Sequence, residues 1–200
     1  MSVARIPIHF DFASTLCYVA HRVMGAMGHD LEALGIELCW TPVDLTQLTG
    51  WPRGADVPDL RRENAERVAR DLAVPVVVPR VWPDSRAANA SVLLAEEAGA
   101  VRAAAWRERV WSALFEERRD LDDPAEVARL AHRTGFAFEP ADLARAGAEL
   151  EQRTLLAAAE EVTGVPTFML DRWAFAGIQS PETMRSIFER WVSRRAQQAG

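Results

Sequence analysis

The chain has 200 residues, a length that suits one domain or one domain with an insertion. Hydrophobic residues make up 49% of it, which is enough for a sizeable core. The formal net charge is -6 at pH 7, and the arginines are interleaved with acidic residues, a pattern that argues against general nucleic-acid binding.

The compartment is indicated by features that the sequence lacks. Residues 1–6 do not contain the long apolar core of a signal peptide. No apolar run approaches the roughly 20 residues of a membrane span. Two cysteines, Cys17 and Cys39, are too few for a disulfide scaffold, and a cytosolic pair is usually reduced. We therefore expect a cytoplasmic protein with two free thiols, no membrane contact and no nucleic-acid partner.

The first predicted elements are a strand over residues 5–12 and a helix over residues 15–34. Within the strand, apolar residues occupy every second position from Ile6 to Phe10, which is the period of a β-strand. Gly35 suits the end of the helix. Two glycines inside the helix weaken it by roughly 1 kcal/mol each relative to alanine, so a bend is possible there.

Ser14 lies where this helix begins. Serine is a favoured N-cap because its oxygen can accept a hydrogen bond from a free backbone N–H of the first turn. A helix N-terminus also attracts anions, so the strand delivers a hydroxyl, and three residues later the thiol of Cys17, to an electropositive point. Taken alone, this pattern favours the simpler interpretation, in which Ser14 only caps the helix and Cys17 only packs.

A second strand is predicted over residues 36–40, so that strand, helix and strand form a right-handed parallel unit. Residues 46–58 follow as a predicted loop, long enough to cover a site. Trp51 in this loop is either a lid residue over an apolar ligand or an anchor into the helical part, and the sequence does not decide between them.

The middle of the chain is predicted to be helical. The expected helices span residues 60–72, 86–97, 100–117, 124–133 and 140–162. Residues 74–79 have the composition of a strand, but their two prolines argue against a central strand. His9, His21 and His29 show no metal-binding spacing, so we expect no metal site and interpret them as surface histidines or hydrogen-bonded core histidines.

The end of the chain predicts a hairpin and a last helix. A Gly-Val-Pro turn at residues 164–166 leads into a strand over 168–170, which a tight turn joins to an edge strand over 173–175. The final helix begins at Pro181 and buries three side chains: Ile187, Phe188 and Trp191.

Five pieces of the chain, taken in order, resemble one group of thioredoxin-like proteins. They are Asp11-Phe12-x-Ser14-x-x-Cys17-Tyr18, Asn89-Ala90 within a helix, Phe115-Glu116-Glu117-x-Arg119-Asp120-Leu121, Gly164-Val165-Pro166-Thr167-Phe168 and Gly177-Ile178-Gln179-Ser180-Pro181-Glu182. The group is the DsbA-related family, which includes 2-hydroxychromene-2-carboxylate isomerases, kappa-class glutathione transferases and FrnE-type oxidoreductases. The resemblance extends over nearly the whole chain.

This resemblance implies an α/β, thioredoxin-like fold with an all-helical insertion. Residues about 1–50 and 150–200 would form the core of a single domain, and residues about 55–150 the insertion, with an extended connector inside it. The Val165–Pro166 peptide would be cis and would face the first turn of the active-site helix. The cleft between core and insertion is the expected ligand site.

The resemblance also implies that glutathione binds. In the serine-type relatives a hydroxyl at position 14 stabilises the thiolate of glutathione, so Ser14 and Cys17 become the candidate catalytic residues. The backbone of Val165, beside Pro166, would pair with the peptide backbone of glutathione as a β-strand does.

Three further residues would meet the ends of glutathione by the same resemblance. Gln179 and Ser180 would contact its γ-glutamyl end. Glutathione-using relatives hold the carboxylates partly through a basic side chain in the region of residues 60–72, and this chain, which has no lysine, offers Arg61 there. The alternative for Arg61 is an ordinary solvated helix face. Homodimers are common in this group, so a homodimer is also expected.

The residue at position 14 limits the chemistry. A dithiol cycle needs a nucleophilic thiol at the helix start and a second thiol one turn later, and a hydroxyl cannot form a mixed disulfide. Ser14 can instead donate a hydrogen bond to a thiolate held beside it, which lowers the pKa of that thiol. We therefore predict a glutathione-dependent transferase or isomerase that acts on a small aromatic substrate.

Two departures from the serine-type pattern leave alternatives open. Cys17 stands where those relatives usually have a second serine, and Gln179 stands where the isomerases tend to carry an acid. The protein could therefore be a relative of DsbA-like thiol-disulfide oxidoreductases that uses Cys17 alone, or a binding member of the family without catalysis.

Overall fold

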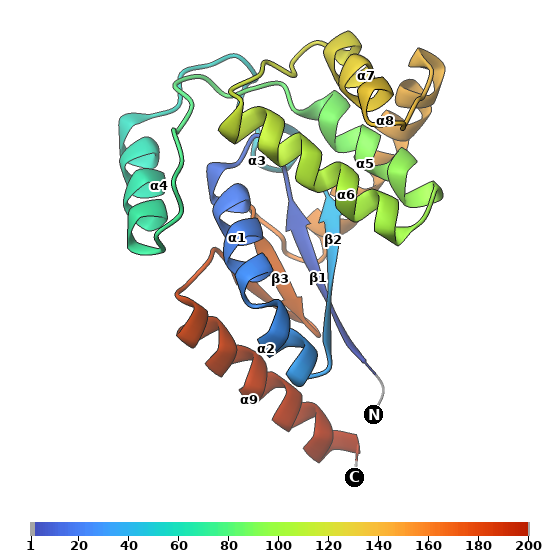
Figure 1. Ribbon diagram of the computed structural model, residues 1–200. Coiled ribbons are helices and arrows are strands. Elements are labelled where there is room, and N and C mark those ends of the chain that lie inside the picture. Colours follow the sequence, from blue (N-terminus) through green and yellow to red (C-terminus); the bar gives the residue numbers. More distant parts are fainter. Residues whose placement is uncertain (1–2, 200) are drawn as a thin grey trace.

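The computed structural model of the protein describes residues 3–199, and its centre is a mixed four-stranded sheet (Figure 1). The strands are β1 (Ala4–Phe10), β2 (Ile36–Pro42), β3 (Thr167–Leu170) and β4 (Trp173–Ala176). Their order is β2-β1-β3-β4, with β1 parallel to β2 and the other neighbouring pairs antiparallel. The predicted α/β class, the parallel first unit and the hairpin at the sheet edge are confirmed.

Helices make up most of the remaining chain. They are α1 (Thr15–Ala26), α2 (Gly28–Ala33), α3 (Leu45–Thr49), α4 (Asp59–Asp71), α5 (Arg86–Glu97), α6 (Ala100–Trp111), the π-helical turn η1 (Ser112–Glu116), α7 (Pro124–Arg133), α8 (Pro140–Ala159) and α9 (Pro181–Ala199). In Figure 1, α5 to α8 gather beyond the carboxyl ends of β1 and β2, and α4 stands beside α1.

One face of the sheet is covered by α1 and α9. Ile6 and Ile8 of β1 are fully buried against Val19 of α1 and Phe188 of α9, in a cluster that also holds Trp191. Alternate residues of a strand point to opposite faces, so the predicted period of β1 places its isoleucines on this covered face. The predicted burial of Phe188 and Trp191 in the last helix is confirmed.

A second cluster joins the sheet to the helical part of the chain. The rings of Phe10 and Phe12 lie 5.9 and 4.5 Å from that of Trp111, which is itself completely buried. Phe115, in the turn after α6, packs into the same cluster. The aromatic residues of this region therefore form core, and one continuous core connects β1 with α5, α6 and α7.

The helix predicted over residues 15–34 is interrupted. Met27 adopts φ -87° and ψ 7°, so α1 ends before it and α2 begins after it. Gly25 precedes the break and Gly28 follows it. Glycine is the least favourable helix residue apart from proline, so the interruption falls where the helix is weakest.

Two other segments differ from their predictions. Residues 46–58 were predicted to be a loop, but they begin with α3, whose N-cap Asp44 accepts hydrogen bonds from the amides of Thr46 and Gln47 at 3.0 and 3.3 Å. The helix predicted over residues 100–117 widens into the π-helical turn η1, where the amide of Glu117 donates to the carbonyl of Ser112. Residues 74–79 are extended but lie in no strand, in keeping with their two prolines.

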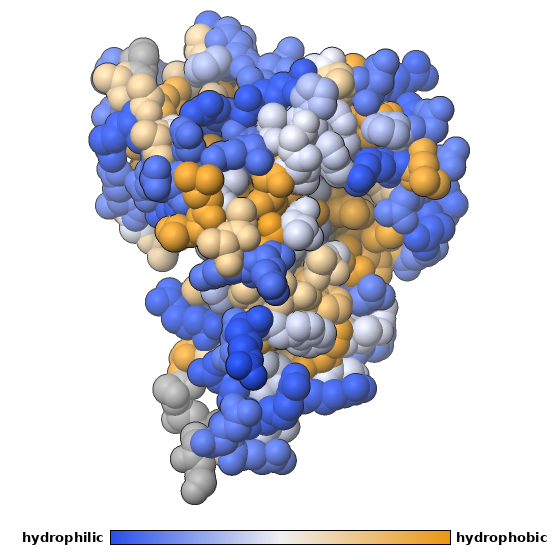
Figure 2. Space-filling model, turned by 180° about the vertical axis from the view of Figure 1, so that it is seen from behind, coloured by the Kyte–Doolittle hydropathy of each residue, from blue (hydrophilic) through white to orange (hydrophobic). Residues whose placement is uncertain are grey.

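Figure 2 shows the face opposite to Figure 1, where apolar side chains are exposed across the middle and hydrophilic side chains predominate above and below. The large apolar side chains exposed on α8 and β4 are Leu155, Leu156 and Trp173. Among the described residues, the helices include none with both the length and the apolar composition needed to cross a membrane.

Candidate functional site

Ser14 is the N-cap of α1, as predicted. Its backbone is extended, and its Oγ accepts a hydrogen bond from the amide of Cys17 at 3.3 Å. The hydroxyl proton therefore remains available to a second acceptor. The same oxygen lies at the helix N-terminus, where the backbone amides of the first turn favour a negative charge.

A cavity of about 540 Å³ opens in front of Ser14. Its walls come from the turn before α1, from α3 and α4, and from residues 78–83 and 163–165. Apolar side chains such as Leu16, Leu45 and Val57 make up much of the lining. The cavity thus combines one hydroxyl at a helix N-terminus with largely apolar walls, which is typical of a small-molecule site.

Trp51 forms part of the cavity wall and is also held in place by its neighbours. Its ring stacks on that of Trp82, with the ring centres 4.8 Å apart, and the guanidinium of Arg61 lies 3.7 Å from the Trp51 ring centre. Backbone hydrogen bonds join its loop to residues 80–82, as between the Gly54 amide and the Trp82 carbonyl at 2.9 Å. Trp51 therefore anchors its loop, in agreement with one of the two interpretations, and it also lines the cavity. A lid over a ligand stays a prediction.

Cys17 lies one turn behind Ser14 and is fully buried, outside the cavity lining. Burial raises the pKa of its thiol to about 12, and this outweighs the lowering effect of the neighbouring Ser14. A thiol of this kind is protonated at neutral pH and closed to solvent, so it is a poor leading nucleophile. Cys39 is half-buried in β2, and both cysteines are free thiols in the structure.

The Val165–Pro166 peptide bond is cis, which confirms the prediction. Val165 lines the cavity together with Ser14 and Arg61. Within residues 3–199, neither the amide nor the carbonyl of Val165 has a hydrogen-bond partner, whereas the carbonyl of Pro166 accepts from the Gly177 amide at 2.8 Å. An unpaired backbone edge therefore borders the cavity at Val165.

The structure does not bring every predicted site residue to this cavity. Pro166, Gln179 and Ser180 are absent from its lining, as is Cys17. Gln179 is exposed, and the hydroxyl of Ser180 accepts a hydrogen bond from the Thr183 amide at the start of α9. Gln179 and Ser180 thus lie outside the cavity that contains Ser14, Arg61 and Val165.

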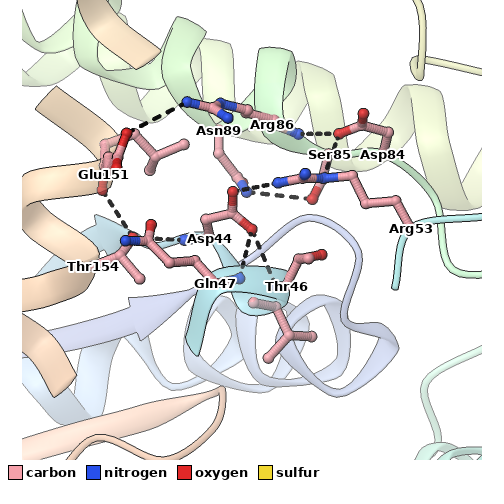
Figure 3. Close-up of polar contacts among 12 residues, drawn as sticks. Asp44, Thr46, Gln47, Arg53, Asp84, Ser85, Arg86, Asn89, Glu151 and Thr154 are labelled. Atoms are coloured by element: carbon pink, nitrogen blue, oxygen red, sulfur yellow. Dashed lines mark hydrogen bonds and ion pairs between the residues drawn. The ribbon is translucent and has the colours of Figure 1, made fainter. Parts of the chain in front are cut away.

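Sequence reasoning missed a buried polar network beside the site. Its acids are Asp11, at 1% exposure, and Asp44, at 6%. Figure 3 shows Arg53 reaching from its loop toward Asp44, with Ser85 and Asn89 of the α5 segment close by. Arg53 also pairs with Asp84 at 2.9 Å. The sequence signals were local: Asp44 precedes Leu-Thr-Gln, an N-cap pattern, and Asp11 and Asn89 belong to two of the quoted motifs. None of these signals shows that the three side chains meet.

The histidines only partly match their prediction. His21 lies with its Nε2 2.5 Å from a carboxylate oxygen of Glu108, on the side of α1 that packs on α6. His9 is 6% exposed, and neither of its ring nitrogens has a hydrogen-bond partner within residues 3–199. The interpretation of His9 as a hydrogen-bonded core histidine is therefore wrong, because its position between β2 and β3 offers its ring no partner.

Comparison with known proteins identifies the family. A model of the DSBA-like thioredoxin domain matches residues 5–189. The chain belongs to the DSBA-like thioredoxin family. The fold is therefore that of a DSBA-like thioredoxin domain, and the resemblance found in the sequence is confirmed. No curated protein matches the chain in sequence.

Solved structures of several DSBA-like proteins share the fold. A 2-hydroxychromene-2-carboxylate isomerase is 19% identical with a TM-score of 0.70, and the match covers 98% of this chain and 97% of the other. A probable DsbA oxidoreductase from Streptomyces coelicolor is 20% identical with a TM-score of 0.71, covering 94% and 89%. The cytosolic disulfide reductase DsbM from Pseudomonas aeruginosa, solved with glutathione, is 20% identical with a TM-score of 0.63, covering 98% of both chains.

Proposed function

We propose that the protein is a glutathione-dependent transferase or isomerase that acts on a small aromatic substrate, with Ser14 as the catalytic hydroxyl. The observation that carries the proposal is the arrangement at the start of α1. A hydroxyl lies on the cavity wall, and the nearest thiol, Cys17, is buried behind it with its pKa raised to about 12. The protein therefore presents no thiol of its own to a substrate in this cavity.

Glutathione supplies the missing sulfur. In the proposed complex its thiolate lies beside Ser14, where the hydroxyl donates a hydrogen bond and the amides at the start of α1 add their partial positive charge. Both interactions favour the ionised thiol, which then attacks an electrophilic substrate. The unpaired amide and carbonyl of Val165 support a strand-like pairing with the backbone of glutathione, and a similar protein was solved with glutathione.

The apolar remainder of the cavity supports an aromatic second substrate. Trp51 and Trp82 present stacked rings there, and Arg61 can offer its guanidinium edge to an anionic group while its face stays on Trp51. Gln179 and Ser180, which lie outside this apolar space, are proposed for the γ-glutamyl end of glutathione on the family resemblance alone. We also propose a cytoplasmic homodimer, and sedimentation analysis tests the dimer.

The test measures glutathione binding by calorimetry and then turnover with an electrophilic aromatic substrate. A hydrogen bond to an ionised group is worth roughly 1.5–3 kcal/mol, so Ser14→Ala should slow turnover by about tenfold to a hundredfold. The fold should survive, because losing an N-cap costs only about 1 kcal/mol. Thr49→Ala, at the cavity wall but in α3, is the matched control and should retain most of the rate.

Two results would contradict the proposal. If the wild-type protein binds no glutathione at millimolar concentration, the non-catalytic alternative takes its place. If glutathione binds but Ser14→Ala turns over as fast as wild type, Ser14 is only a helix cap. A different pattern would support the oxidoreductase alternative: the wild type shows no transferase activity but reduces disulfides, and Cys17→Ala loses that reductase activity.

A further inference from the structure

Asp11 is a buried carboxylate three residues before Ser14. It directly follows β1 and is only 1% exposed. Its Oδ1 accepts hydrogen bonds from the Ala13 amide, at 2.8 Å, and from the Ser85 hydroxyl. Its Oδ2 accepts from the Leu45 amide at 2.6 Å. Both oxygens are thus engaged by donors from three separate segments.

These three segments form walls of the cavity. Ala13 precedes Ser14 in the turn before α1, and both line the cavity. Leu45 is the first residue of α3 and also lines it. Ser85 follows the lining residue Pro83 and precedes α5. The Asp11 carboxylate therefore joins the turn that carries the hydroxyl to two walls of the space in front of it.

Asn89 strengthens the same junction. Its Oδ1 accepts from the Phe12 amide at 3.2 Å, and its Nδ2 donates to the carbonyl of Val43 at 3.1 Å and to the Ser85 hydroxyl at 3.3 Å. Asn89 is fully buried. Asn89 accepts from the Phe12 amide and Asp11 from the Ala13 amide, so two buried side chains hold two consecutive backbone amides of the segment between β1 and α1.

We propose that Asp11 is a positioning residue, whose carboxylate fixes the turn Ala13–Ser14 against α3 and the start of α5 and thereby sets the direction of the Ser14 hydroxyl. The catalytic consequence rests on the proposed function of Ser14, whereas the fixing of the turn does not. A carboxylate suits this place because it accepts at both oxygens. An asparagine would turn an NH₂ group toward one of the donors and lose that contact.

Asp44 provides a matched control. It is also a buried acid at the edge of the network, it accepts from the Thr46 and Gln47 amides, and it pairs with Arg53 (Figure 3). It makes no side-chain hydrogen bond to residues 11–17. Asp44→Asn therefore removes a comparable carboxylate from the same region without releasing the turn before α1.

The first arm of the experiment needs no ligand. Amide hydrogen exchange is followed in wild type, Asp11→Asn and Asp44→Asn. In Asp11→Asn the amides of Ala13 and Cys17 should exchange faster by roughly three- to tenfold, the change expected when one buried hydrogen bond is lost. In Asp44→Asn the faster amides should be those of Thr46 and Gln47, with Ala13 and Cys17 as in wild type.

The second arm measures how each variant changes the pKa of the thiol of bound glutathione. The ionisation of bound glutathione is titrated through the ultraviolet absorbance of its thiolate. Asp11→Asn should raise the pKa of the bound thiol toward that of free glutathione, because the Ser14 hydroxyl no longer points at the sulfur. A purely electrostatic influence of Asp11 has the opposite sign, since removing a carboxylate lowers the pKa of a neighbouring thiol. Asp44→Asn should leave that pKa unchanged.

The outcomes separate the two proposals. An unchanged or lowered thiol pKa in Asp11→Asn, or equal effects of Asp11→Asn and Asp44→Asn, would overturn the positioning role. If wild type binds no glutathione, the proposed function fails and the exchange arm alone decides the role of Asp11. If Asp11→Asn does not fold, Ser85→Ala takes its place, because this variant removes one donor to the Asp11 carboxylate. If the Ala13 and Cys17 amides of Ser85→Ala then exchange as slowly as in wild type, the inference is contradicted.

Discussion

At the scale of single residues, position 14 decides which chemistry this fold can support. The hydroxyl of Ser14 and the thiol of Cys17 are one helical turn apart, but the hydroxyl lies on the cavity wall and the thiol is fully buried. A dithiol site needs a reactive thiol in front as well as a resolving thiol behind, and this chain has a thiol only in the second place. A cysteine at position 14 would supply the missing half.

Ser14→Cys is therefore expected to convert the site into a Cys-x-x-Cys oxidoreductase. The new thiol would lie at the N-terminus of α1, where the amides and the helix dipole lower the pKa of a cysteine, and Cys17 would resolve the mixed disulfide. The measurement is reduction of a protein disulfide such as insulin, with thiols counted before and after oxidation.

The matched control for this gain of activity is the double variant Ser14→Cys, Cys17→Ala. It keeps the accessible thiol but has no resolving partner, so it should form mixed disulfides and not turn over. Equal activity of the single and double variants would show that Cys17 takes no part. No activity in either would show that position 14 is closed to disulfide substrates.

His9 makes stability depend on pH in the mildly acidic range. Burial lowers its pKa below the ordinary value of 6.5, and the charge of Glu160, just after α8, partly counteracts this. Below pH 6.5 the unfolded chain binds a proton that the folded chain does not, so the free energy of unfolding falls as the pH falls toward the lowered pKa. The loss ends once the folded protein is also protonated.

His9→Leu should remove this part of the pH dependence. The free energy of unfolding in urea, measured between about pH 5 and pH 8, should decline less steeply in the variant than in wild type. His29→Gln, at an exposed position, serves as the control and should follow wild type. Parallel profiles for wild type and His9→Leu would mean that His9 is protonated equally in both states.

At the scale of elements, two glycines in the segment from α1 to β2 have different roles. Gly25 is exposed inside α1, and an added Cβ would meet no atom within 4 Å. Gly35, between α2 and β2, has φ +66°, a conformation that L side chains rarely adopt. One glycine weakens a helix without need, and the other is required by a turn.

Gly25→Ala and Gly35→Ala should therefore shift stability in opposite directions. Alanine at position 25 should stabilise by about 1 kcal/mol, the difference between the two residues in a helix interior. Alanine at position 35 should destabilise by roughly 1–2 kcal/mol, the cost of a left-handed conformation. Urea unfolding compares both with wild type, and destabilisation by Gly25→Ala would indicate that the break at Met27 depends on a flexible residue before it.

At the scale of the whole molecule, local patterns predicted the elements and the family resemblance predicted Ser14 as a site residue, whereas only tertiary contacts could reveal the network around Asp11. The alternation from Ile6 to Phe10, the N-cap Ser14 and the Val-Pro turn are all visible in neighbouring residues, and each led to a confirmed prediction. The donors to the Asp11 carboxylate include Leu45 and Ser85, which are 34 and 74 residues away.

No local pattern marks such partners. The short helix α3 was missed because a helix of 5 residues has too few positions to show a period, and the stack of Trp51 on Trp82 depends on two loops that meet only in the folded chain. The prediction that Gln179 and Ser180 contact glutathione came from the family resemblance, and the cavity at Ser14 does not include these two residues.

The continuous aromatic core also determines how the molecule should unfold. Trp111 of α6 is fully buried and contacts the rings of Phe10 and Phe12, which belong to the sheet segment, and of Phe115 in η1. Helices α5 to α7 therefore share one core with the end of β1. We expect the helical insertion and the sheet to unfold in a single cooperative transition, because neither keeps a complete core when the other is lost.

Trp111→Ala tests this coupling. Removing a buried tryptophan should cost about 3–5 kcal/mol, and the loss should appear equally in far-ultraviolet circular dichroism, which reports mainly the helices, and in the fluorescence of the remaining tryptophans. The control is Trp173→Ala, whose side chain is 50% exposed on the edge strand β4 and should cost far less. If Trp111→Ala separated the two transitions, the insertion would be an independent folding unit, and the aromatic contacts with Phe10 and Phe12 would be an interface between units instead of a common core.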